Sequence, residues 1–143
     1  MVGVFLVILL IGLFIIARGA SAPLPSRTVV DLTALTFDVA DTDALRRQGL
    51  SGRASLAPFD GMRFVFGASG IYPFWMKDMT FPIDIVWLDN GIVVDVVTLP
   101  PPSNGAIPVT HIPTHAADEV LEFPAGRAAA MDLRPGTRVI LPR

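Results

Sequence analysis

The clearest pattern in this chain is a series of short apolar stretches separated by turn residues. Two of these stretches, residues 81–88 and 92–99, flank the tripeptide Asp89-Asn90-Gly91. An Asn-Gly pair between two apolar runs is a strong hairpin signal, because both residue types tolerate the positive φ angles that tight hairpin turns require. The pattern therefore predicts two antiparallel strands joined by a short turn.

Further apolar stretches predict a mainly-β fold. Alternation at Leu35, Phe37 and Val39 indicates that residues 27–40 contain a pair of short strands. More strands are predicted at 62–66, 71–76, 119–123 and 138–141, with turns at 60–61, 67–70 and 135–136. Two short helices are predicted at 44–48, after an N-cap signal at 41–43, and at 125–131. Residues 100–118 are rich in proline and predict a long loop.

Many short strands with only two brief helices predict an antiparallel sandwich or a barrel-like domain. We expect residues 28–143 to form this single domain, preceded by a linker at 23–27.

Residues 1–22 predict a signal peptide or an N-terminal membrane anchor. The apolar run from Val2 to Ala17 is followed by Ala20-Ser21-Ala22, a pattern that signal peptidases cleave. Arg18 lies after the run and Pro23 follows the cleavage pattern, and both features favour an uncleaved anchor instead. In either case we expect the domain to be exported, to the periplasm or another extracytoplasmic location. If residues 1–22 are not cleaved, they attach it to the membrane.

Charge and composition exclude several classes of function. The chain has 11 basic and 13 acidic residues, and without Arg18 the balance is 10 − 13 = −3. This balance argues against a nucleic-acid partner, since phosphates attract clustered Lys and Arg. The absence of cysteine excludes disulfides, thiolate metal sites and cysteine nucleophiles. Because the sequence also contains no nucleophile elbow and no phosphate-binding loop, we expect no cofactor and favour a non-enzymatic role.

Asp84 is the most unusual residue, because it is a carboxylate within the apolar stretch 81–88. In a strand it would share a face with Val86 and Leu88, and both faces of this strand have an apolar pattern. A buried carboxylate requires hydrogen bonds or a cation. Asp84 therefore either ties a loop to the sheet or is a catalytic or ligand-binding group. Its candidate cationic partners are Lys77, Arg46 and Arg53.

Trp75 and Lys77 form a second candidate site. Strand alternation places these two side chains on one face and Phe74 and Met76 on the other. An aromatic ring beside a cation can bind a sugar ring, a carboxylate or a lipid headgroup, although a tryptophan can also serve packing alone. With Asp84, Arg53 and the 100–118 loop, these residues form the expected recognition surface for an unknown envelope ligand or protein.

Two alternative functions have weaker sequence signals. Asp84 and Glu122 could form the paired carboxylates of a hydrolase, although Glu122 could equally be a solvated or arginine-paired strand residue. Copper could bind methionine and histidine side chains, but Pro113 prevents a helix that would bring both histidines onto one metal, so we predict no metal site. The side chains concerned are Met62, Met76, Met79, His111 and His115.

Four ordered blocks resemble a known family. They are the segment 46–53 (RRQGLSGR), the segment 60–66 (DGMRFVF), the segment 74–79 (FWMKDM) followed by 82–85 (PIDI), and the segment 120–126 (VLEFPAG). Together they resemble the family called domain of unknown function 192, over residues 28 to 142. The resemblance implies a mostly-β, sandwich-like fold and frequent export, and it implies no particular activity.

Overall fold

The computed structural model describes residues 28–103 and 105–143. The elements in these residues are β1 (Val29–Asp31), β2 (Phe37–Ala40), α1 (Asp43–Gln48), β3 (Gly61–Gly70), β4 (Phe74–Trp75), β5 (Ile83–Asp89), β6 (Ile92–Leu99), β7 (Thr110–His111), β8 (Ala117–Pro124), α2 (Arg127–Ala130) and β9 (Arg138–Ile140). The predicted signal peptide or anchor at 1–22 and the linker at 23–27 lie outside the described residues. No helix in the described part of the chain is long and apolar enough to span a membrane.

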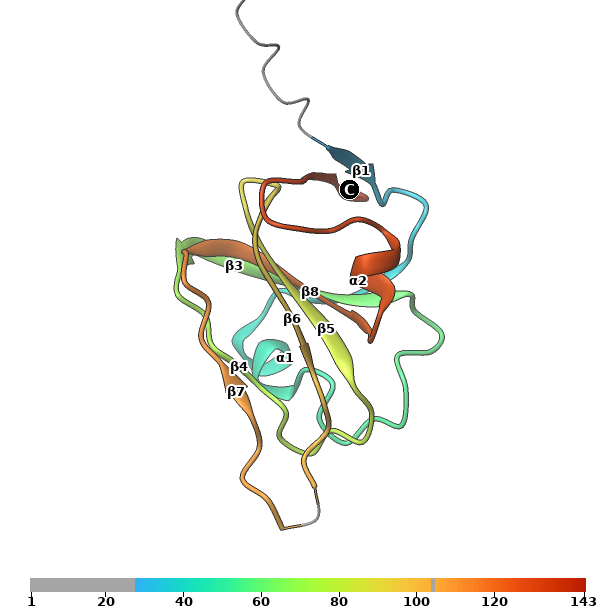
Figure 1. Ribbon diagram of the computed structural model, residues 1–143, viewed down its shortest axis with the longest axis vertical. Coiled ribbons are helices and arrows are strands. Elements are labelled where there is room, and N and C mark those ends of the chain that lie inside the picture. Colours follow the sequence, from blue (N-terminus) through green and yellow to red (C-terminus); the bar gives the residue numbers. More distant parts are fainter. Residues whose placement is uncertain (1–27, 104) are drawn as a thin grey trace, which may run out of the picture.

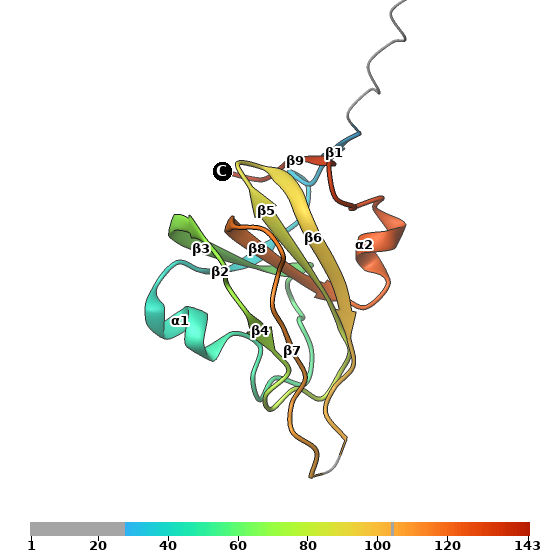
Figure 2. The same cartoon turned by 60° about the vertical axis from the view of Figure 1, so that its left-hand side comes forward.

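The main sheet is strongly curled, as the two ribbon views show (Figures 1 and 2). Its strand order is β1-β9-β6-β5-β8-β3-β2, and a separate two-stranded ribbon pairs β4 with β7. The four central contacts β6–β5, β5–β8, β8–β3 and β9–β6 are antiparallel. The prediction of a mainly-β, antiparallel and barrel-like domain with two short helices is therefore confirmed.

The central hairpin forms as its sequence predicts. β5 and β6 pair from Ile83↔Leu99 to Asp89↔Ile92. The turn residues Asn90 and Gly91 have φ angles of 49° and 72°. Positive φ at both turn positions matches the right-handed twist of the flanking strands.

Two local predictions, for residues 67–70 and 100–118, differ from the structure. The predicted turn at 67–70 is part of β3, which instead has an irregular register against β8 between Val65 and Gly70. The two strands predicted in 27–40 are present as β1 and β2, and each pairs in parallel with a distant strand, β1 with β9 and β2 with β3. The loop at 100–118 contains β7, which pairs with β4. Such pairings join distant segments, so local periodicity does not reveal them.

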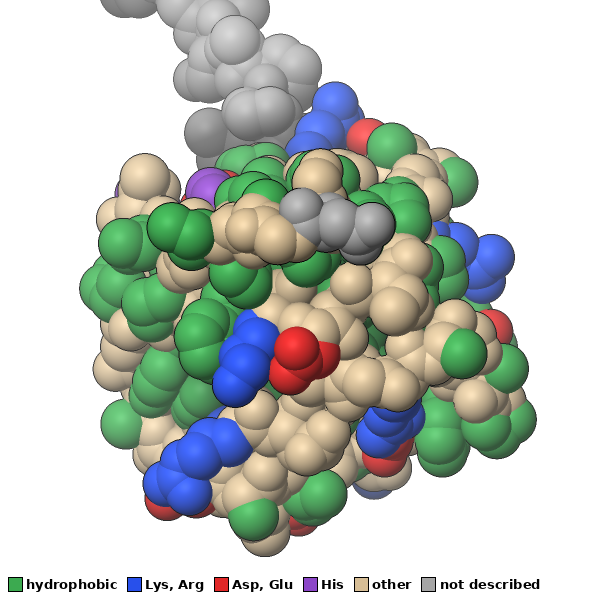
Figure 3. Space-filling model, turned by 90° about the horizontal axis from the view of Figure 1, so that it is seen from below, with side chains coloured by type: hydrophobic (Ala, Val, Ile, Leu, Met, Phe, Trp, Pro, Cys, Tyr) green, Lys and Arg blue, Asp and Glu red, His purple; other side chains and the backbone are tan. Residues whose placement is uncertain are grey.

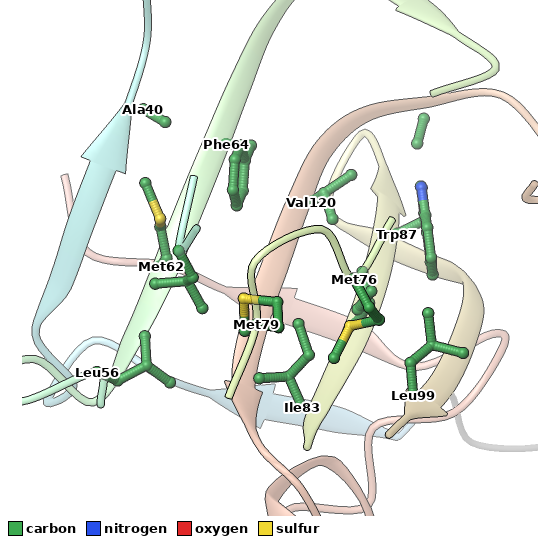
Figure 4. Close-up of a cluster of buried hydrophobic side chains, with 13 residues drawn as sticks. Ala40, Leu56, Met62, Phe64, Met76, Met79, Ile83, Trp87, Leu99 and Val120 are labelled. Carbon is green, nitrogen blue, oxygen red and sulfur yellow. The ribbon is translucent and has the colours of Figure 1, made fainter. Parts of the chain in front are cut away.

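Hydrophobic side chains pack on both faces of the sheet. The alternation in β5 divides its residues as predicted, with Ile83, Ile85 and Trp87 in one cluster and Val86 and Leu88 in the other. Figure 4 shows the first cluster, in which Met62, Met76 and Met79 lie among side chains from β3, β5 and β8. The second cluster lies under α2 and includes Leu121, Phe123, Ala128 and Leu133.

Helix α1 lies on the side of the first cluster and is held mainly by its ends. The Leu45 backbone N–H donates to Thr42 Oγ1 at 3.3 Å, which confirms the predicted N-cap. At the other end Gly49, with φ of 49°, donates its N–H to the Leu45 carbonyl. None of the helical residues is buried, and the Arg46 guanidinium donates to the Val65 carbonyl of β3 at 2.6 Å. This placement leaves the arginines of α1 beside β4.

Gly61 is expected to tolerate no larger residue, because β8 lies against it. A Cβ atom at this position would be 2.9 Å from the Glu122 carbonyl oxygen and 3.0 Å from the Phe123 ring. We predict that Gly61→Ala lowers the free energy of unfolding by about 1–3 kcal/mol, since overpacking forces the backbone to shift. Gly67→Ala is the matched control, because nothing lies within 4 Å of its Cβ position. Equal urea denaturation midpoints for the two variants would contradict this prediction.

Candidate functional site

A groove lies between α1 and the segment that contains β4. It has a volume of about 440 Å³, which is within the range of small-molecule sites. We call it the aromatic groove, and its lining residues are Arg46, Arg47, Phe64, Phe66, Tyr72, Pro73, Phe74, Trp75 and Lys77. Most of this lining is apolar, with cations from two separate segments.

The walls of the aromatic groove are fixed by aromatic packing. Phe66 stacks on Tyr72 with ring centroids 3.6 Å apart, and Arg46 lies over the Phe66 ring at 5.5 Å. Phe64 contacts Phe74 edge to face at 4.9 Å. Rings held by such contacts form a surface that is in place before a ligand arrives.

Trp75 and Lys77 lie together on the rim of the groove, as the strand alternation predicts. The Lys77 ammonium lies 5.4 Å from the centre of the Trp75 ring. Trp75 is 55 % exposed, whereas the intervening Met76 is completely buried. A large aromatic side chain that remains exposed in this way offers a stacking surface to a ligand.

The cations around the groove differ in how much of their charge is already paired. Arg46 forms an ion pair of 2.5 Å with Asp43, and this contact lowers the pKa of the Asp43 carboxyl. Arg47 is 80 % exposed and lies 4.0 Å from the same carboxylate. Arg47 and Lys77 are therefore the groups most able to receive an anion. On the lower face of the molecule, Lys and Arg side chains lie beside hydrophobic side chains (Figure 3).

Glu122 lies at the inner end of the site. A cavity of about 40 Å³ shares five lining residues with the aromatic groove and extends to Met79 and Glu122. Glu122 is 5 % exposed, and its Oε2 atom has no hydrogen-bond partner in the described part of the chain. Burial raises the pKa of this carboxyl to about 8, although the charge of Arg53 opposes the shift. The carboxyl is therefore mostly protonated at neutral pH.

This environment corrects the two expectations for Glu122 as a solvated or arginine-paired residue. Arg53 donates instead to Asp38 at 2.6 Å and does not line the groove. The sequence did contain a signal for burial. Glu122 shares a strand face with Val120, and the strand is apolar on both faces. This pattern could not show that Arg46 and Arg47 of α1 line the same cavity as Glu122.

The contacts of Asp84 stabilise the fold and do not form part of a binding site. It is 1 % exposed and accepts hydrogen bonds from Thr98 Oγ1 at 2.6 Å and from the Ala128 backbone N–H at 2.8 Å. Its partners are thus not the three cations expected from the sequence. Gly126, at the N-cap of α2, has no side chain that could accept from the helix, so the Asp84 carboxylate of β5 takes that role. Asp84 ties α2 to the sheet.

The sheet separates Asp84 from Glu122. Glu122 is paired across the strands with Ile85, and Asp84 is paired with Phe123. Paired residues share a face, and neighbours along a strand lie on opposite faces. Asp84 therefore faces the cluster under α2, and Glu122 faces the small cavity beside the aromatic groove. The structure does not bring the two carboxylates of the hydrolase hypothesis together.

The residues of the copper hypothesis are also dispersed. Met62, Met76 and Met79 are core side chains of the first cluster. His111 Nε2 lies 2.9 Å from Asp95 Oδ2, and His115 Nδ1 lies 2.9 Å from Thr114 Oγ1. Among the residues that the structure describes, no three His, Asp or Glu side chains gather as a metal site would require. Of the 100–118 loop, none of the described residues (100–103 and 105–118) lines the aromatic groove.

The fold and the site define a class of protein: a curled, mainly antiparallel sheet with an apolar groove and, beside it, a small cavity lined by a buried carboxyl group. The chain belongs to the family DUF192, described as "Uncharacterized ACR", whose model matches residues 26–141. No curated protein matches the chain.

Two solved structures are similar to this one. A protein of unknown function from Novosphingobium aromaticivorans DSM 12444 is 25% identical, with a TM-score of 0.60 and coverage of 71% of each chain. A protein from Sinorhizobium meliloti 1021, described as a "putative transcription regulator", is 28% identical, with a TM-score of 0.61. That match covers 73% of this chain and 79% of the other.

Proposed function

We propose that this protein is a non-enzymatic, exported binding module of the cell envelope, whose ligand occupies the aromatic groove. One observation carries this proposal: an exposed tryptophan with a lysine over its ring borders a groove of about 440 Å³ with aromatic walls. The apolar walls suit a ring or hydrocarbon body. Arg47 and Lys77 on the rim suit an anionic group, such as a carboxylate or a phosphate.

The proposed binding surface contains only some of the residues expected from the sequence. Trp75 and Lys77 remain in it, while Asp84 lies on the opposite face of the sheet and Arg53 is paired with Asp38. The α1 arginines replace them as the cationic part of the site. The membrane-attached or periplasmic location stays a prediction from residues 1–22.

Benzoate and its uncharged analogue benzyl alcohol provide a direct test, in which binding is followed by NMR shifts of the backbone amides of the groove-lining residues. Trp75→Ala should weaken benzoate binding about five- to tenfold, since a stacking ring contributes about 1–1.5 kcal/mol. Lys77→Met should weaken benzoate binding several-fold and leave benzyl alcohol binding unchanged. Both side chains are exposed, so neither substitution should alter folding.

Ile140→Ala is the matched control, because Ile140 is an exposed apolar residue of β9 that does not line the groove. It should bind both probes as the wild-type protein does. Shifts that are absent, or that occur only away from the groove, would refute the proposed function.

A further inference from the structure

The cavity behind the aromatic groove has the size of one small chemical group. Its volume of about 40 Å³ exceeds what a single water molecule needs and is too small for a ring. It shares Phe64, Phe74 and Trp75 with the outer groove, so a ligand body in the groove can extend one substituent into it. A polar substituent enters such a space favourably only if it finds a hydrogen-bond partner there.

The Glu122 carboxyl is the polar group at the end of this cavity. Its Oε2 atom is buried and has no hydrogen-bond partner in the described part of the chain, a condition that native structures rarely leave without a role. The surrounding charged groups are otherwise engaged. Arg53 pairs with Asp38, and Arg46 pairs with Asp43 and the Val65 carbonyl. Arg47 is largely in solvent.

We propose that Glu122 donates a hydrogen bond to an uncharged oxygen atom of the ligand, whose anionic end lies at Arg47 and Lys77. This inference rests on the proposed function and specifies its ligand class: a ring-containing organic anion with a carbonyl or ether oxygen at the opposite end. A neutral carboxyl has one O–H donor for such an oxygen. A ligand ammonium group is disfavoured, because it would lose its hydration and pass the cations Arg46 and Arg47.

A matched pair of probes tests this inference. In 4-acetylbenzoate the substituent has a carbonyl oxygen, and in 4-isopropylbenzoate a methyl group replaces that oxygen at nearly the same shape. The wild-type protein should bind the acetyl compound about tenfold more tightly below pH 8, since a group built to hydrogen-bond rejects an apolar substitute. Above pH 8 this preference should decline, as Glu122 loses its proton and with it the donor.

Two variants separate hydrogen bonding from packing. Glu122→Gln keeps an N–H donor and should retain the preference at every pH from 6 to 9. Glu122→Met fills the same space without a donor and should bind both probes equally. Isothermal titration calorimetry on each folded protein gives these ratios.

The outcomes distinguish this inference from the proposed function. If both probes bind the groove with equal affinity to the wild-type protein, or if the preference for 4-acetylbenzoate grows above pH 8, the role of Glu122 is refuted and the groove remains. If neither probe binds, the proposed function fails, and the inference fails with it.

Discussion

Replacing Asp84 with alanine should lower the free energy of unfolding by about 3–5 kcal/mol, as urea denaturation of the purified protein would show. The carboxylate accepts one bond from Thr98 and one from the Ala128 N–H, and the site is almost completely buried. Hydrogen bonds to charged groups contribute about 1.5–3 kcal/mol each, and the deletion leaves two buried donors without an acceptor. The second cluster should loosen first, because α2 loses its tie to β5.

Asp89→Ala is the control for this result, since Asp89 lies on the same strand and accepts a bond from Ser69 at the surface. Its effect should stay below about 1 kcal/mol. Asp84→Asn should fall between the two, because it keeps the shape of the side chain and one acceptor oxygen. An Asp84→Ala protein as stable as the wild type would mean that Asp84 does not hold α2. If binding to the groove also disappeared in a folded Asp84 variant, Asp84 would belong to the site after all.

Replacing Glu122 with glutamine should stabilise the protein at neutral pH. The pKa of this carboxyl is about 8 in the folded state, against a reference value of 4.5. Between these values the unfolded chain has lost the proton that the folded chain keeps, so folding stability falls as pH rises, by ~1.4 kcal/mol per pH unit. Glutamine does not titrate. The free energy of unfolding of Glu122→Gln should therefore exceed that of the wild type by roughly 3 kcal/mol at pH 7.

The pH dependence of this stabilisation provides the controls. The gain should vanish near pH 4, where both states of the wild-type protein are protonated, and should level off above pH 8. Glu119→Gln on the same strand should not stabilise the protein, because Glu119 forms an ion pair of 2.6 Å with Arg63. Unfolding free energies from pH 4 to 9 would show both. A gain of equal size at pH 4 and pH 7 would contradict a titrating Glu122.

A role in ligand binding would explain why the protein contains Glu122 although this acid lowers its stability. A buried, unpaired carboxyl group lowers stability at neutral pH, and polar groups of that sort concentrate where a protein binds or reacts. Asp84, in contrast, has partners for its buried oxygens and serves the fold. The two carboxylates are alike in sequence context and opposite in role.

The sequence by itself determined the features that depend on neighbouring residues. The Asn90-Gly91 hairpin, the Thr42 cap of α1, the two faces of β5 and the common face of Trp75 and Lys77 all follow from turn chemistry and from alternation. These patterns report which positions are buried and which are exposed. They do not report what a buried group meets.

The tertiary structure alone decided the partners of those groups. Asp84 meets the Ala128 N–H, which is 44 positions away along the chain, and Glu122 lies at a cavity walled by α1 and β4. Both arrangements depend on the order and curl of the strands, including parallel pairings at the two edges of the sheet. Because strand order is a property of long-range contacts, local periodicity could place both carboxylates in buried strands without showing that they lie on opposite faces of the sheet.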